Sequence, residues 1–168
     1  MKPVALQIAM EKEAQGVLAA LGLMPLKSPD KRLPFLYYEG KVGGCPVVAS
    51  VSGKDPRYGT DNIGLESAAL QAMALMLGFK PRLVVNAGTA GSFASLGAEI
   101  GDVYLSRDCF VFHDHRVPLG EFEPRGQGRF PSVDSAALAE ALGLKRGIVS
   151  SGSSLDYTER DLEVFHSL

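Results

Sequence analysis

Two glutamates stand directly after the first apolar segment of the chain, residues 4–9, in the run Met10-Glu11-Lys12-Glu13. A carboxylate at the carboxyl end of a buried strand can act as a general base on a water molecule. Glutamates in the first turn of a helix are also favoured by the helix dipole and need no function. For Glu11 we prefer that structural role, whereas the residues alone leave Glu13 open between the two.

A second candidate site is Gly88-Thr89-Ala90-Gly91, which follows the apolar segment 83–85. Small residues after a strand let a ligand approach the backbone, but a plain bend requires them too. The chain contains neither GxxxxGK[ST] nor GxGxxG. Taken alone, the segment favours a bend, while its position favours a site, because open α/β sheets bind ligands beyond the carboxyl ends of strands.

Metal and serine chemistry have little support in the sequence. His113-Asp114-His115 offers three ligand types, but alternate residues of an extended segment face opposite ways. No HExxH motif or cysteine cluster accompanies it, and no GxSxG motif is present. We therefore predict no metal site.

The elements that must position these groups alternate along the chain. Apolar runs predict strands over residues 4–9, 35–39, 46–52, 83–85, 103–112 and 148–151. Helices are predicted over residues 11–21, from Asp61 as N-cap to Leu77, from Asp134 to Gly143, and from Thr158 onward with Asp161. Residues 23–34 and 113–131 are expected to be loops. This order predicts a single α/β domain over residues 1–168 with a mainly parallel sheet.

Composition argues against several classes of partner. Seventeen Lys and Arg against nineteen Asp and Glu give a net charge of −2, which leaves no basic excess for nucleic acid or an anionic membrane. The longest mostly apolar stretch, residues 68–79, is shorter than the ~20 residues of a membrane span. No signal-peptide pattern begins the chain, and Cys45 and Cys109 form no CxxC motif. We therefore expect a cytoplasmic protein.

Four short segments follow one another in a recognisable order: residues 9–13 (AMEKE), 86–91 (NAGTAG), 100–103 (IGDV) and 151–156 (SGSSLD). Together they resemble the 5′-methylthioadenosine/S-adenosylhomocysteine nucleosidases of the nucleoside phosphorylase superfamily. Residues 102–118 look most like the plant-type branch. The resemblance implies a three-layer phosphorylase/hydrolase-like α/β fold with a central mixed, mainly parallel sheet, incomplete at its C-terminus.

The resemblance also implies an activity and its residues. Nucleosidases of this family use water to cleave the N-glycosidic bond between adenine and a 5′-thio-substituted ribose, without a cofactor, in methionine salvage. Glu13 matches the glutamate that positions and activates the water. Six residues match positions that contact the nucleoside: Met10 beside the ribose, Thr89, Ala90 and Gly91 beneath it, and Leu155 and Asp156 at the adenine.

Phosphorolysis would require cationic donors for a phosphate dianion. Related bacterial-type purine phosphorylases carry Gly-Asp-Pro-x-x-Arg after the first strand and an arginine entering the glycine-rich loop, where this chain has residues 10–13 and Asn86. The acidic first loop favours a nucleosidase. A purine nucleoside phosphorylase and a non-catalytic nucleoside-binding or interaction module stay as alternatives.

Two parts of the family pattern fall outside the 168 residues. They are a glutamate that holds the ribose hydroxyls and an aspartate that protonates the leaving adenine. Because general acid–base assistance is typically worth ~10²–10⁴-fold, we expect the chain as it stands to be inactive or strongly impaired. The resemblance also implies a homodimer, and Phe112 and Pro118 are expected near the interface between its subunits.

Overall fold

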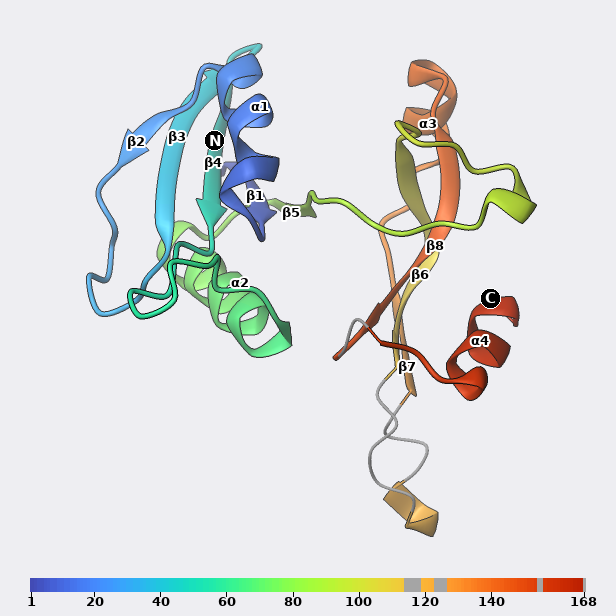
Figure 1. The fold of residues 1–168 in the computed structure, drawn as a ribbon. Coiled ribbons are helices and arrows are strands. Elements are labelled where there is room, and N and C mark those ends of the chain that lie inside the picture. The colour runs from blue at the N-terminus through green and yellow to red at the C-terminus, as the bar shows by residue number, and fades with distance from the viewer. Residues whose placement is uncertain (114–118, 123–126, 154–155, 168) are drawn as a thin grey trace. The chain divides into compact units, whose positions relative to one another are not determined.

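The computed structural model describes residues 1–113, 119–122, 127–153 and 156–167. The chain divides into two compact units, Met1–Gly91 and Ser92–Leu168, and each is considered by itself (Figure 1). In the described part of the chain, no helix has the length and hydropathy that crossing a membrane requires. The single domain expected over residues 1–168 stays a prediction.

A five-stranded mixed sheet forms the centre of the first unit. Its strands are β1 (Val4–Ile8), β2 (Met24–Leu26), β3 (Leu36–Val42), β4 (Cys45–Val51) and β5 (Leu83–Asn86), in the order β2-β3-β4-β1-β5. β1 runs parallel to both β4 and β5, whereas β2 and β3 are antiparallel additions at one edge. The carboxyl ends of β1, β4 and β5 therefore lie at one edge of the sheet.

Two helices cover opposite faces of this sheet. Alternate residues of a strand point to opposite faces, so Ala5 of β1 packs with Leu75 of α2 (Leu65–Phe79), while Ile8 packs with Ala14 of α1 (Glu11–Leu21). Apolar residues predominate in β4, because a strand covered on both faces buries all its side chains. The helix–sheet–helix layers confirm the predicted three-layer α/β fold with a mixed sheet.

A small polar network lies between α2 and the sheet. Gln71 is 1% exposed, and its Nε2 donates to the carbonyl oxygen of Ile8 (3.2 Å) and to Ser50 Oγ (3.1 Å). Gln7 Nε2 donates to Gln71 Oε1 (3.3 Å) and to the carbonyl oxygen of Ala68 (2.7 Å). Buried amides require such partners, so Gln71 does more than interrupt an apolar stretch. It ties α2 to the last residues of β1 and β4.

The second unit contains a three-stranded sheet and short helices. Its elements are η1 (Ala94–Leu96), β6 (Tyr104–His113), β7 (Gln127–Pro131), α3 (Ala136–Leu142), β8 (Lys145–Gly152) and α4 (Glu159–His166). The order is β7-β6-β8, with β6 parallel to β8 and antiparallel to β7. The carboxyl ends of β6 and β8 meet, and His113 stands opposite Gly152.

Several predicted boundaries differ from the structure. β2 lies within the predicted loop 23–34, and β7 lies within the predicted loop 113–131. Both are short strands with a proline and little alternation, and pairing with a longer neighbour stabilises them. Thr158 and Asp161 are confirmed at the start of α4, where Asp161 Oδ2 accepts hydrogen bonds from the Thr158 backbone N–H (2.7 Å) and from Thr158 Oγ1 (2.8 Å).

The predicted N-cap of the second long helix is wrong. α2 begins at Leu65 with Gly64 as its N-cap, and it ends beyond Gly78, with Lys80 in the left-handed conformation as its C-cap. Asp61 is not available to α2, because its backbone forms an antiparallel bridge with Lys54 and its carboxylate accepts from the backbone N–H of Glu11.

Gly53 joins β4 to the loop 53–62 and allows a close backbone contact. Its φ is +70°, and a Cβ there would lie 2.2 Å from the carbonyl oxygen of Pro34. We expect Gly53→Ala to lower the free energy of unfolding by several kcal/mol, from ~1–2 for the left-handed backbone and ~1–3 for the overlap. Gly43→Ala is the matched control, because its φ is +54° and its Cβ would meet nothing within 4 Å. Urea denaturation of both variants measures the difference, and equal losses would contradict the contact.

Candidate active site

Three segments meet at the carboxyl edge of the first sheet. They are residues 9–13 after β1, residues 52–62 after β4 and residues 87–91 after β5. β1 is the central member, because it pairs with β4 on one side and β5 on the other. The backbone N–H of Ala87 donates to the carbonyl oxygen of Gln7 (3.0 Å) and continues that pairing to the end of the strand.

Glu13 is held between two of these segments. It lies in the first turn of α1, where its Oε2 accepts from the backbone N–H of Met10 (3.2 Å). Its Oε1 accepts from the backbone N–H of Thr89 (2.7 Å) and from Thr89 Oγ1 (2.7 Å), 76 residues further along the chain. The side chain is half-buried, so the carboxylate is fixed in position and still reaches solvent. A carboxylate in this state can accept a proton from a bound water.

Gly88 allows Thr89 to come this close. A Cβ on Gly88 would lie 3.3 Å from Glu13 Oε1 and 3.5 Å from Oε2. Neither Gly88 nor Gly91 has a positive φ, so the requirement at position 88 is space rather than backbone conformation. The glycine-rich segment is therefore more than a plain bend.

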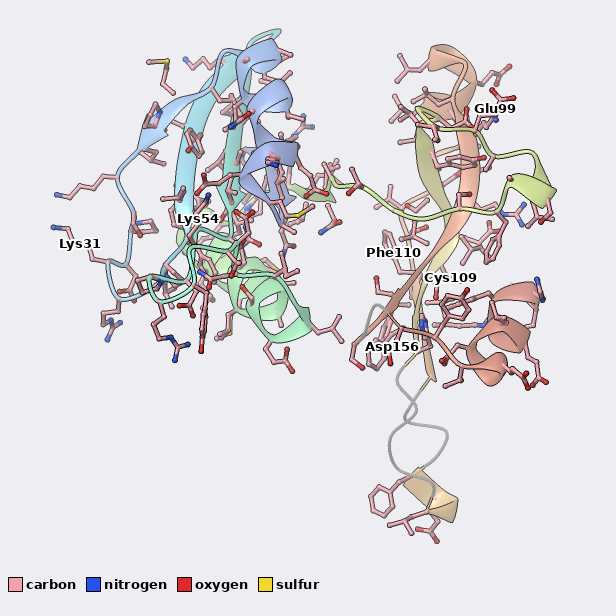
Figure 2. The ribbon with its side chains drawn as sticks, viewed as in Figure 1. Lys31, Lys54, Glu99, Cys109, Phe110 and Asp156 are labelled. Carbon is pink, nitrogen blue, oxygen red and sulfur yellow. The ribbon has the colours of Figure 1, made fainter. Side chains whose placement is uncertain are left out.

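The remaining predicted site residues fall into three groups. Met10 is the half-buried N-cap of α1 in an extended conformation, and its backbone joins Glu13 and Thr89 in one cluster. Ala90 and Gly91 continue the Thr89 segment as exposed residues. Asp156 is an exposed residue of the second unit, between β8 and α4 (Figure 2). Leu155 lies outside the described residues, as does Pro118.

The segment 52–62 contributes residues that sequence reasoning missed. Ser52 Oγ donates to the carbonyl oxygen of Ala9, and Asn62 Nδ2 donates to the carbonyl oxygen of Ser52 (3.3 Å). Asp61 Oδ1 accepts from the backbone N–H of Glu11 (3.2 Å). These contacts tie the end of β4 to the segment that precedes Glu13. The residue type of Asp61 indicates a helix cap, but the sequence does not show which helix Asp61 caps.

Charged groups of both signs lie close to Glu13 in the chain and at the strand ends, including Lys12 and Lys54. Glu11 and Asp61 lie in the neighbouring positions, and Lys54, which follows β4 (Figure 2), stands 3.7 Å from Glu11 Oε2. The guanidinium and backbone N–H of Arg57 hold the pKa of Asp55 at about 2, so this arginine is engaged within its own loop.

The other two arginines of the first unit also have partners. Arg32 pairs with Asp30 at 2.7 Å, and Arg82 Nη2 donates to Cys45 Sγ (3.2 Å) before β5, at the amino end of that strand. The fully described residues 1–91 thus direct no arginine at Glu13. Such an edge suits a neutral ligand better than a phosphate dianion.

Among the described residues, no group of three His, Cys, Asp or Glu side chains could hold a metal ion. His113 ends β6, and its Nδ1 lies 2.8 Å from Ser150 Oγ of β8. Its ring lies edge-on to Phe165 of α4, with the centroids 4.8 Å apart. Asp114 and His115 lie outside the described residues.

Comparison with known proteins identifies the family. The sequence profile of the Phosphorylase superfamily matches residues 3–164. The chain belongs to this superfamily. A 5′-methylthioadenosine nucleosidase of Arabidopsis thaliana is 37% identical over 156 residues, and a 5′-methylthioadenosine/S-adenosylhomocysteine nucleosidase of the same plant is 34% identical over 158 residues. These matches cover 92% and 93% of this chain.

Solved structures support the same relationship. The apo structure of the Arabidopsis thaliana 5′-methylthioadenosine nucleosidase matches with a TM-score of 0.90 at 33% identity, over 99% of this chain and 69% of that one. The superfamily member described here spans 58% and 62% of the length of the two curated plant relatives. The predicted resemblance to these nucleosidases is confirmed.

The fit between Gly88 and Glu13 can be tested without any ligand. We expect Gly88→Ala to push the Glu13 carboxylate away from Thr89, because a Cβ at 3.3 Å is closer than such contacts normally allow. The Thr89 amide should then shift its NMR resonance and exchange with solvent faster. Gly91→Ala, whose Cβ would meet nothing within 4 Å, is the matched control. Identical Thr89 amides in the two variants would show that Gly88 does not govern the contact.

Proposed function

We propose that this superfamily member is a nucleosidase that hydrolyses the N-glycosidic bond of 5′-methylthioadenosine. The observation that carries the proposal is the Glu13 carboxylate, held by Met10 and Thr89 at the edge where β1 and β5 end. The names and similarity of the plant relatives support the choice of substrate. We further propose that the two compact units belong to one nucleosidase-like domain.

The chemistry follows from the charge that the reaction develops. Cleavage of the C1′–N9 bond leaves an oxocarbenium-like ribose, which a nearby carboxylate stabilises. Water attacks C1′ and gives a proton to Glu13, and the bonding electrons pass to N9 of adenine. Adenine takes up a proton from solvent, and Glu13 returns its proton to solvent. The products are adenine and 5-methylthioribose. We assign the proton to Oε2, because this oxygen accepts only the longer bond, from Met10 (3.2 Å).

The substrate-binding roles are proposed from the resemblance to these nucleosidases. Thr89, Ala90 and Gly91 would lie beneath the nucleoside, with Met10 beside the ribose. The backbone around Leu155 and Asp156 would read the adenine edge, which requires donors and acceptors but no charge. S-Adenosylhomocysteine, named for the second plant relative, is a further candidate substrate.

The family's general acid and ribose-binding glutamate have no match within the 168 residues. Such assistance is typically worth ~10²–10⁴-fold. A non-catalytic nucleoside-binding or interaction module is the alternative, and it would bind the nucleoside without cleaving it. A purine nucleoside phosphorylase is less favoured, because residues 1–91 direct no arginine at Glu13.

Release of adenine from 5′-methylthioadenosine, with and without phosphate, tests the proposal. Any turnover should be independent of phosphate and should fall by ~10²–10⁴-fold in Glu13→Gln, because the amide cannot accept the proton. Glu11→Gln is the matched control in the same helical turn and should keep the activity. Phosphate-dependent formation of ribose 1-phosphate products would identify a phosphorylase, and binding without turnover would favour the module.

We also propose that the protein forms a homodimer in which Phe112 lies near the interface between the two subunits. Phe112 is a half-buried residue of β6, the central strand of its sheet. We expect Phe112→Ala to weaken self-association, because removing an interface aromatic deletes buried apolar area. Sedimentation across a range of concentrations measures the dissociation constant, and an unchanged constant would contradict the assignment.

A further inference from the structure

Asp61 caps a helix that begins 50 residues before it in the chain. Its Oδ1 accepts from the backbone N–H of Glu11 (3.2 Å), the first residue of α1. The first N–H groups of a helix have no partner within the helix, so a carboxylate from another segment can satisfy one of them. The helix dipole favours a negative charge at this end.

The peptide groups around Met10 are all held. The carbonyl oxygen of Ala9 accepts from Ser52, the N–H of Met10 donates to Glu13, and the N–H of Glu11 donates to Asp61. Ser52 is 2% exposed, so its contact is shielded from water. Glu13 is thus attached to a backbone segment that the loop after β4 holds on either side.

The loop that carries Asp61 is itself closed by hydrogen bonds to the residues that follow β4. Asn62 donates to the Gly53 carbonyl oxygen through its backbone N–H (2.8 Å) and to the Ser52 carbonyl oxygen through Nδ2 (3.3 Å). Asp61 pairs with Lys54 in an antiparallel bridge. A residue held in this way transmits the position of β4 to the start of α1.

We propose that Asp61 is a positioning residue for Glu13, and this inference rests on the proposed nucleosidase function. Asp61 holds the Glu11 N–H, so that the Met10 N–H and the first turn of α1 keep the Glu13 carboxylate on Thr89. The neighbouring Lys54–Glu11 pair does not serve this purpose. Its atoms are 3.7 Å apart and partly exposed, and exposed pairs of this kind contribute little.

Amide hydrogen exchange, followed by NMR on the complete 168-residue chain, tests the inference without requiring turnover. In Asp61→Ala, the Glu11 and Thr89 amides should both exchange about tenfold faster, because one charge-assisted hydrogen bond is lost. Asp61→Asn keeps an oxygen acceptor and should retain the protection of both amides. Glu11→Gln removes the pair with Lys54 but not the amide bond, and it should leave Thr89 unchanged.

Two results would overturn the inference. One is a Thr89 amide that is unchanged in Asp61→Ala while the Glu11 amide loses protection. The other is an Asp61→Asn variant in which the Glu11 and Thr89 amides exchange as fast as they do in Asp61→Ala. If Asp61→Ala does not fold, Asp61→Ser replaces it, because the shorter hydroxyl stops short of the Glu11 N–H. Release of adenine that depends on phosphate would contradict the proposed function and leave the exchange result readable. With turnover, Asp61→Ala should lower kcat and leave KM unchanged.

Discussion

The meeting of Glu13 with Thr89 depends on one constraint, the parallel pairing of β1 with β5. This pairing brings the residues after both strands to the same edge of the sheet and continues to the bond between Ala87 and Gln7. Thr89 follows two residues later and presents two donors to one carboxylate oxygen. An antiparallel β5 would carry the glycine-rich segment to the opposite edge, away from α1.

Two carboxylates at this edge are held by hydrogen-bond donors. The Glu13 carboxylate accepts hydrogen bonds from the backbone N–H groups of Met10 and Thr89, and the Asp61 carboxylate accepts one from the first N–H of α1. Beneath this edge, Gln71 ties α2 to the ends of β1 and β4. The polar groups thus hold the strand ends together, while the apolar clusters on either face hold the helices to the sheet. The site is built on strand ends and a helix start, which are more rigid supports than loops alone.

The second unit uses a similar arrangement on a smaller scale. β6 and β8 are parallel, so His113 and Gly152 stand at the same edge. A Cβ at Gly152 would lie 2.6 Å from His113 Nε2, so the glycine leaves room for the imidazole ring, as Gly88 leaves room for Glu13. In both units, a glycine after or at the end of a strand leaves space for a polar side chain: Glu13 of α1, which follows the parallel neighbour β1, and His113 of the parallel neighbour β6.

The sequence by itself determined most of the strand-and-helix order, the α/β class, and Glu13 and the Thr89 segment as candidates, whereas the three-layer class came from the resemblance to the nucleosidases. These depend on local patterns of apolar residues and on motifs that one stretch of chain contains. The tertiary structure alone decided that Oε1 of Glu13 accepts from Thr89, that Gly88 supplies space, and that Asp61 caps α1 rather than α2. Short strands such as β7 were missed for the same reason, since a neighbouring strand stabilises them. A capping carboxylate is recognisable locally, but the helix that it caps depends on which strands pair, and that pairing joins residues far apart in the chain.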